Sequence, residues 1–330
     1  MPGKKTLNQM WQHVLSLSAL LENESVVVLD KIGEGSQYRD IAIEAARATG
    51  ANVVCVLVPP TGPLPEAAVP AIREADLMID LLFSHDPRIR QFGRESGLRT
   101  LVVLEPPEIL ERLMPVLDDK RRVLAAQKAI GKAHWLRVTS PAGTDFSGPL
   151  GQLHGNCQYG FADDRGHWDQ WPGSFVTTYA NDGKAEGTIV IDAGDMIFPF
   201  KEYVRNPIKL HIKSGFIRAI EGEFDANYMK SVLDSYNNPD VFAVSHLGWG
   251  LTKLARWNTL GLYDKKATEG QDGRAFYGNF LFSTGPNLSG GGTRKAPCHL
   301  DIPLRNCSVY LDDVPMVLDG DVIPADQRAA

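Results

Sequence analysis

The sequence lacks the features that mark membrane, nucleic-acid-binding and disulfide-rich proteins. No apolar run approaches the roughly 20 residues needed to span a bilayer. Basic residues form no block and the net charge is −6, so neither nucleic acid nor a membrane is expected as a partner. The four cysteines (55, 157, 298 and 307) are scattered and form no C-x-x-C pair. These absences favour a cytoplasmic protein with reduced thiols.

Motifs of several common enzyme classes are also missing. The segment "DKIGEGSQYRD" follows an apolar run, but Tyr38 stands where the dinucleotide motif G-x-G-x-x-G requires its last glycine. The sequence contains no phosphate-binding G-x-x-x-x-G-K-[ST] loop and no G-x-S-x-G nucleophile elbow. We therefore exclude a nucleotide-binding role and disfavour an α/β-hydrolase.

The patterns that are present differ between the two parts of the chain. In residues 1–135, apolar β-branched runs such as 25–30 and 52–59 alternate with helical spacing such as 38–50, which predicts a parallel sheet flanked by helices. In residues 136–330, paired strand patterns at 208–223 and 307–323 are joined by Gly or Asp turns. We expect an α/β domain over residues 1–135 and an α+β domain over residues 136–330.

The segment "PCHLDIPLRNC" concentrates potential metal ligands. His299 and Asp301 are two residues apart, so on a strand they project from the same face. A third ligand from elsewhere, such as His246 in "SHLGWG", would complete the 2-His-1-carboxylate set of a non-haem iron site. A zinc–thiolate site is disfavoured, because Cys298 would point to the opposite face and Cys307 lies well beyond His299. A polar pair at a strand end, with no metal, stays open as the alternative.

Long motifs along the chain resemble the 2,5-dihydroxypyridine 5,6-dioxygenase family of bacterial nicotinate catabolism. They include "QYGFADDRGHWDQWP" (158–172), "GRAFYGNFLFSTGPN" (273–287) and "TRKAPCHLDIPLRNCSVYLDD" (293–313). The resemblance implies an Fe(II) cofactor held by His246, His299 and Asp301. It also implies O2 and a small hydroxylated N-heteroaromatic substrate as partners, with 2,5-dihydroxypyridine opened to N-formylmaleamate. A homo-oligomer with a thermophilic-type leucyl aminopeptidase-like architecture is expected.

Further residues are candidates for the reaction. His85 follows an apolar run that we expect to be a strand, and α/β proteins form their sites at the carboxyl ends of such strands. The resemblance also includes a histidine at this position, so we expect His85 to be the acid or base. The alternatives are a solvent-exposed loop residue for His85, a turn residue for Ser283 and a core residue for Trp171. We assign Ser283 as a hydrogen-bond donor to substrate or oxygen, His167 as a second proton-transfer candidate, and Gln158, Gln170 and Trp171 as pocket residues.

Departures from the family pattern keep alternatives open. The family carries an acid and a histidine where this chain has Gln158 and Gln170, and amides do not relay protons at neutral pH. A related hydroxypyridine or pyridone, such as 3-hydroxy-4-pyridone, is therefore an alternative substrate. A metallo-aminopeptidase and a non-catalytic protein of the same fold are alternative functions. Phe175 stands where the peptidases carry a ligand glutamate, which favours one metal ion over two.

Overall fold

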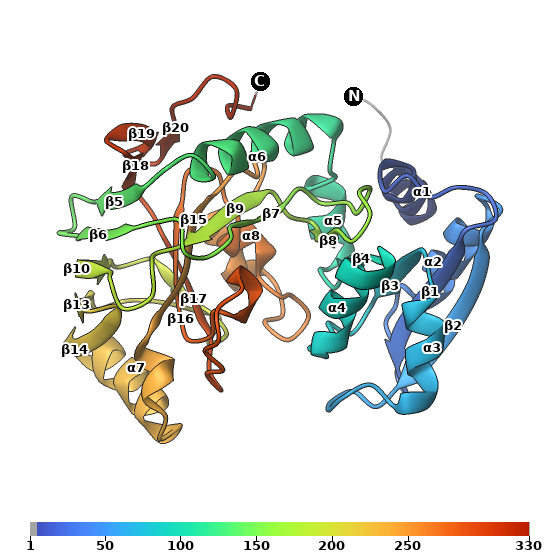
Figure 1. The fold of residues 1–330 in the computed structure, drawn as a ribbon, viewed down its shortest axis with the longest axis horizontal. Helices are drawn as coiled ribbons and strands as arrows, with labels where there is room; N and C mark the ends of the chain where they lie inside the picture. The colour runs from blue at the N-terminus through green and yellow to red at the C-terminus, as the bar shows by residue number, and fades with distance from the viewer. Residues whose placement is uncertain (1–4, 330) are drawn as a thin grey trace. The chain divides into compact units, whose positions relative to one another are not determined.

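The computed structural model describes residues 5–329, which form two compact units (Figure 1). Among the described residues, unit 1 comprises 5–117, 158–173 and 266–269, and unit 2 comprises 118–157, 174–265 and 270–329. This division is discontinuous, unlike the single boundary at residue 135 expected from the sequence. The reason is that strand β8 (Trp168–Trp171) pairs in parallel with strand β4 (Arg99–Val103) and so returns to the first sheet.

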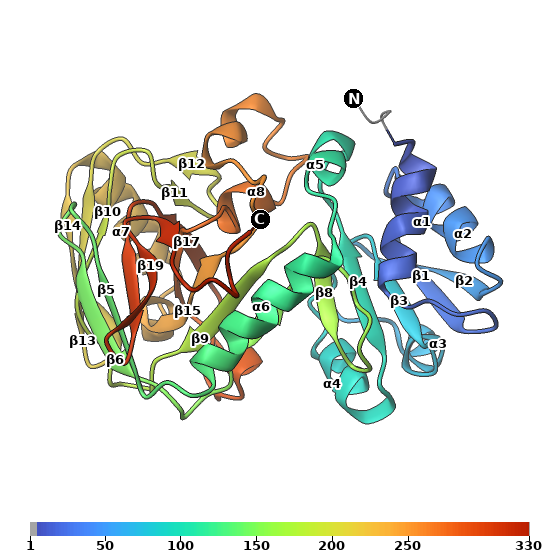
Figure 2. The ribbon, with the colours of Figure 1, turned by 90° about the horizontal axis from the view of Figure 1, so that it is seen from above.

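Unit 1 is built on a five-stranded parallel sheet in the order β2-β1-β3-β4-β8. Helices α1 and α2 lie on one face and α3 and α4 on the other (Figure 2). The expected α/β organisation is thereby confirmed. The remaining elements are β1 (Ser25–Lys31), β2 (Asn52–Val58), β3 (Leu77–Asp80), α1 (Leu7–Leu17), α2 (Arg39–Arg47), η1 (Glu66–Ala68), α3 (Val69–Arg73), α4 (Pro87–Ser96) and α5 (Pro107–Arg112).

The core of unit 1 follows from the composition of its central strands. Strand β1 contains the run Val26–Leu29, whose side chains are buried on both faces of the sheet. Valine and leucine suit such a position because helices cover both faces of a parallel sheet. Strand β3 is equally buried but ends at Asp80, three residues before the end of the apolar run, because the Asp80 carboxylate accepts main-chain hydrogen bonds from the following turn.

Unit 2 contains two main sheets. The first has eight strands in the order β14-β13-β10-β6-β5-β18-β19-β20, and the second has five in the order β17-β16-β15-β9-β7. The first comprises β14 (Phe216–Gly222), β13 (Ile208–Lys213), β10 (Glu186–Ile191), β6 (Asp145–Pro149), β5 (Trp135–Thr139), β18 (Ser308–Leu311), β19 (Val314–Leu318) and β20 (Asp321–Val322). The second comprises β17 (Leu300–Leu304), β16 (Phe280–Thr284), β15 (Val244–Gly250), β9 (Phe175–Tyr179) and β7 (Asn156–Gln158).

The two sheets of unit 2 meet through buried aromatic side chains. The rings of Phe146 on β6 and Phe282 on β16 make an edge contact with centroids 6.0 Å apart. A small hairpin and several helices surround the sheets: β11 (Met196–Ile197), β12 (Glu202–Tyr203), α6 (Leu117–Ile130), α7 (Phe224–Ser235), η2 (Pro239–Phe242), η3 (Trp257–Leu262), α8 (Gln271–Arg274) and η4 (Leu288–Gly290). Across residues 5–329, every helix is too short or too polar to cross a membrane.

Candidate metal centre

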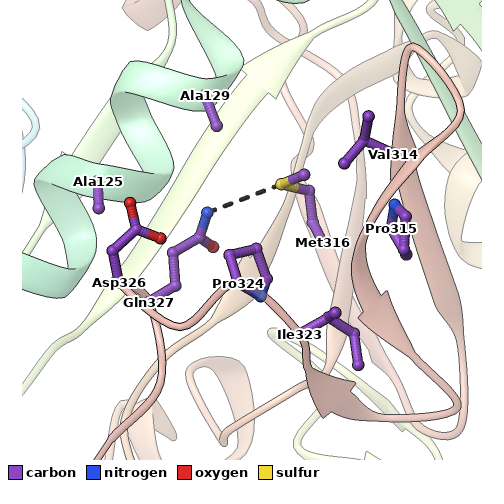
Figure 3. Close-up of a pocket in the computed structure, with 9 residues that line it drawn as sticks. All are labelled: Ala125, Ala129, Val314, Pro315, Met316, Ile323, Pro324, Asp326 and Gln327. Carbon is purple, nitrogen blue, oxygen red and sulfur yellow. Dashed lines mark hydrogen bonds between the residues drawn. The ribbon is translucent and has the colours of Figure 1, made fainter.

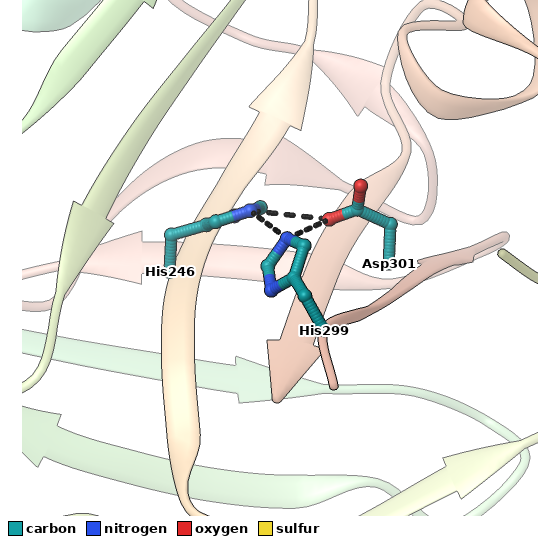
Figure 4. Close-up of side chains that lie close together, drawn as sticks. All are labelled: His246, His299 and Asp301. Atoms are coloured by element: carbon teal, nitrogen blue, oxygen red, sulfur yellow. Dashed lines mark hydrogen bonds and ion pairs between the residues drawn. The ribbon is translucent and has the colours of Figure 1, made fainter. Parts of the chain in front are cut away.

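Three side chains of the five-stranded sheet in unit 2 point toward one another (Figure 4). The Nε2 atoms of His246 and His299 are 3.1 Å apart. The Oδ1 atom of Asp301 lies 3.1 Å from His246 Nε2 and 3.2 Å from His299 Nε2. His246 comes from β15, whereas His299 immediately precedes β17 and Asp301 is the second residue of that strand. The spacing of His299 and Asp301 therefore places both side chains on one face, as expected.

The pairing of β15 with β16 is irregular beside His246. The register between β15 and β16 shifts between Val244 and Leu247, so that His246 lies within the irregularity. Bulges re-aim side chains and leave a main-chain group unpaired. Here the hydroxyl of Ser283 donates to the carbonyl oxygen of His246 over 2.7 Å. Ser283 is fully buried. Its hydroxyl proton, which we expected to be donated to substrate or oxygen, is donated to the His246 carbonyl oxygen instead.

Two glycines allow the strands near the ligands to approach closely. A Cβ atom at Gly248 on β15 would lie 1.9 Å from the carbonyl oxygen of Val176 on β9. Gly285 has φ +101° just after β16, and a Cβ there would lie 2.1 Å from the carbonyl oxygen of Cys298. Only glycine fits such approaches without moving the backbone. The second approach positions the segment that carries His299.

Main-chain contacts hold His299 and Asp301. The Nδ1 atom of His299 lies 2.8 Å from the carbonyl oxygen of Thr284, which makes Nδ1 the donor and leaves the Nε2 lone pair directed at Asp301 and His246. Asp301 exchanges two main-chain hydrogen bonds with Phe198, of 2.8 and 3.1 Å. By contrast, Nδ1 of His246 is buried without a hydrogen-bond partner among the described residues.

The electrostatics of the three groups favour a cation between them. Burial alone would raise the pKa of Asp301, but the two histidines hold it well below its usual range. Burial lowers the pKa of His246, which favours the neutral imidazole that binds metal. Burial also opposes charge on His299, yet the neighbouring Asp301 carboxylate raises the pKa of His299. The carboxylate is therefore ionised at neutral pH and available as a ligand.

The three donor atoms fit one metal ion. Asp301 Oδ1 is buried and accepts no well-formed hydrogen bond, so its charge lacks a donor among the described residues. For metal–ligand bonds of about 2.1 Å, two ligands at a right angle lie about 3.0 Å apart, close to the spacings seen here. Within residues 5–329, this is the one cluster of three or more His, Cys, Asp or Glu side chains with that proximity. A single-ion site is therefore favoured over a two-ion site.

Arg274 is a neighbour of this centre that the sequence analysis missed. Its Nε lies 3.3 Å from Asp301 Oδ2, and its guanidinium lies 4.7 Å from the ring centroid of Phe198. The arginine thus faces the carboxylate oxygen that the histidines do not. No local motif identifies Arg274, because it comes from α8, 27 residues before Asp301 in sequence.

The other candidate residues lie in unit 1 or at its boundary. His85 follows β3, and Gln170 and Trp171 end β8, so all three lie at the carboxyl end of the parallel sheet. Gln170 is 2% exposed, and its Nε2 has no hydrogen-bond partner among the described residues. The buried Oε1 of Gln158 also lacks a hydrogen-bond partner among them. Trp171 is fully buried, with its ring 5.5 Å from that of Trp11. These two unpaired amides are suited to a polar ligand.

His167 is already engaged within unit 1. Its Nε2 lies 2.8 Å from Asp169 Oδ2, and its ring stacks on Tyr159 with centroids 4.5 Å apart. Asp169 is fully buried, and burial raises its pKa despite the contact with His167. Asp169 also accepts main-chain hydrogen bonds from Tyr159 and Gly160. This network holds the loop before β8, and the proton-transfer role of His167 stays a prediction.

A separate apolar pocket of about 360 Å³ lies in unit 2 (Figure 3). It is lined by Ala125 and Ala129 of α6 and by Met316, Pro324 and Gln327 of the C-terminal part of the chain. The Oε1 atom of Gln327 accepts a hydrogen bond of 3.3 Å from Trp249 Nε1. None of the candidate residues lines this pocket.

Comparisons with known proteins agree with the geometry. A sequence model described as 2,5-dihydroxypyridine 5,6-dioxygenase matches residues 6–324. The 2,5-dihydroxypyridine 5,6-dioxygenase of Pseudomonas putida KT2440 is 46% identical over 345 aligned positions, covering 98% of each chain. A solved structure of 2,5-dihydroxypyridine dioxygenase from Pseudomonas putida KT2440 superposes with a TM-score of 0.93 at 45% identity, covering 99% of this chain and 100% of the other.

Proposed function

The chain belongs to the 2,5-dihydroxypyridine 5,6-dioxygenase family, and from this premise we propose that it opens the ring of 2,5-dihydroxypyridine with O2. The bond between ring carbons 5 and 6 breaks, and each carbon takes one oxygen atom. Carbon 5 becomes the carboxyl group and carbon 6 the formyl group of N-formylmaleamate, so both atoms of O2 are accounted for. The observation that carries the proposal is the convergence of His246, His299 and Asp301 in unit 2.

His246 Nε2, His299 Nε2 and Asp301 Oδ1 are the atoms that would hold Fe(II). Two neutral imidazoles and one carboxylate suit a ferrous ion and leave coordination positions open on one side. When bound, Fe(II) supplies the one-electron chemistry through which O2 reacts with an organic ring. The contacts from Thr284 O to His299 and from Ser283 to the His246 carbonyl fix two of the ligands before the ion arrives.

His85 is the group that we propose to accept the ring-hydroxyl proton. Its imidazole is exposed and makes no hydrogen bond to the described residues, so both ring nitrogens are available. Removal of that proton makes the ring more electron-rich and easier to oxidise. Gln158 and Gln170 are proposed to hydrogen-bond the polar edge of the ring, which their unpaired amide atoms support. The aminopeptidase-like architecture and a homo-oligomer remain part of this proposal.

An oxygen-electrode assay tests the proposal. The protein is loaded anaerobically with Fe(II) and mixed with a panel of 2,5-dihydroxypyridine, other hydroxypyridines and 3-hydroxy-4-pyridone. We expect one O2 consumed per 2,5-dihydroxypyridine and slower turnover of the other rings. Preference for a pyridone would contradict 2,5-dihydroxypyridine as the substrate. Peptidase activity of the zinc-loaded protein, with no O2 uptake on any ring, would contradict the dioxygenase assignment.

A further inference from the structure

The turn after β3 is anchored by a buried carboxylate. Asp80 is fully buried, and its Oδ1 accepts from the main-chain N–H of Leu82 over 3.0 Å. Its Oδ2 accepts from the N–H of Ser84 over 2.8 Å. Because the two oxygens bind amides on either side of Phe83, the carboxylate fixes the course of the turn. Burial, with a contribution from Asp30, raises the pKa of Asp80 to about 6, although those amides favour the ionised form.

Phe83 holds an unfavourable backbone conformation in this turn. Its φ is +58°, in the left-handed region that bulky residues rarely adopt. Its ring lies 4.8 Å from the ring of His85 and 6.1 Å from that of Trp168, measured between centroids. The guanidinium of Arg90 lies 3.9 Å from the centroid of Trp168. The strained backbone therefore places the Phe83 ring in tilted contact with the rings of both His85 and Trp168.

The other side of His85 is also fixed. Asp86 begins α4 and is buried, and its carboxylate accepts from the main-chain N–H groups of Leu64 and Arg88 over 2.8 and 2.9 Å. His85 thus lies between two anchored acids, while its own ring makes no hydrogen bond to a described residue. The direction of its imidazole depends on the backbone of the turn and on the Phe83 ring.

We propose that Asp80 and Phe83 are positioning residues that orient His85 for proton transfer. The inference rests on the proposed role of His85 and deepens it. Strain at a bulky residue persists only where surrounding contacts hold it, and such strain concentrates at functional sites. An asparagine at position 80 would place an amide nitrogen against one of the two N–H groups, so one hydrogen bond of the turn would be lost. A glycine at position 83 would relieve the strain but remove the ring.

A double-mutant cycle on the Fe(II)-loaded enzyme tests the inference. D80N, H85Q and D80N/H85Q are compared for kcat, KM, their pH profiles and thermal unfolding. We expect D80N to lower kcat by about 10-fold to 100-fold, although its unfolding temperature at neutral pH does not fall. In the H85Q background, D80N should have almost no further effect, because its action passes through His85. The same cycle with F83A or F83G in place of D80N changes no charge, and both variants should lower kcat only where His85 is present.

Asp30 offers a control of similar burial, and it differs from Asp80 in pairing with Arg39. It is also fully buried at the end of the neighbouring strand, and it accepts from the N–H of Ser36 in a loop without a histidine. D30N should therefore leave kcat within about 2-fold of the wild type. Equal losses for D80N with and without His85 would overturn the inference while leaving the role of His85 intact. Full activity of H85Q would instead overturn that role, and the inference with it.

Discussion

Asp301 shows how one residue determines the character of the candidate site. Its ionised oxygen faces two imidazole nitrogens at 3.1 and 3.2 Å and has no well-formed hydrogen bond, which is an unfavourable arrangement unless a cation is shared. The local spacing of His299 and Asp301 made this pair predictable. His246 is 53 residues away from His299, and its place beside the pair depends on the pairing of β15, β16 and β17, which no local pattern reveals.

Removal of a ligand should abolish tight metal binding. We expect H246Q, H299Q and D301N each to lower Fe(II) affinity by at least about 100-fold, because each removes one of three protein ligands. His211 on β13 serves as a control, since its Nε2 pairs with Glu221 on the surface. Metal content after dialysis against a chelator measures the effect. Wild-type content in D301N, with H211Q also unchanged, would place the metal elsewhere.

Arg274 should tune the same carboxylate. R274Q leaves Asp301 Oδ2 without its cation, so the carboxylate loses orientation and Fe(II) affinity should fall by about 10-fold, with R274K falling less. Arg305 is a matched control, because it lies over the Trp257 ring and pairs with the buried Asp195. Anaerobic chelator competition gives the affinities. An R274Q affinity equal to that of the wild type, or a similar loss in R305Q, would remove Arg274 from the site.

Asp80 gives a pH-dependent prediction. Its pKa is raised from an ordinary value near 3.8 to about 6 in the folded protein, so the folded state binds the proton more tightly than the unfolded state. The stability that this proton contributes is fully present below pH 3.8 and is lost as the pH rises through 6. The loss amounts to about 3 kcal/mol on full ionisation. D80N avoids this loss and should gain stability relative to the wild type between pH 4.5 and pH 7.5. Urea unfolding at both pH values measures the difference, and a constant difference would contradict the account.

Strand β15 shows what one element contributes to the site. Its apolar, glycine-flanked sequence makes a buried strand predictable, and the strand spans Val244–Gly250. The need for glycine at position 248 follows only from the approach of β9, since a Cβ would meet the Val176 carbonyl at 1.9 Å. Such contacts between strands distant in sequence leave no periodic pattern in either segment.

Substitution at Gly248 should therefore be costly. G248A forces β15 and β9 apart, and we expect a loss of more than about 3 kcal/mol in the free energy of unfolding. Gly261 is the control, because a Cβ there meets nothing within 4 Å. G261A should change stability by less than about 0.5 kcal/mol. Urea unfolding of both variants decides the matter, and equal stabilities would show that the strands adjust easily.

At the scale of the whole molecule, elements that pair within one segment were predictable from the sequence, and pairings between distant segments were not. The run 25–30 and the hairpin 208–223 correspond to β1 and to β13–β14, because each pattern is contained within one segment. The return of β8 to the sheet of unit 1 was not predictable, because it depends on pairing with β4 across more than sixty residues of chain. The resemblance to a known family supplied the function, which periodicity alone does not give.

The central claim is that this chain inserts both atoms of O2 into 2,5-dihydroxypyridine. Turnover of the Fe(II)-loaded protein under 18O2, with mass analysis of the product, tests it most directly. The account predicts N-formylmaleamate that carries two labelled atoms, one on the carboxyl group and one on the formyl group. A product with one labelled atom or none, in freshly quenched samples, would contradict it.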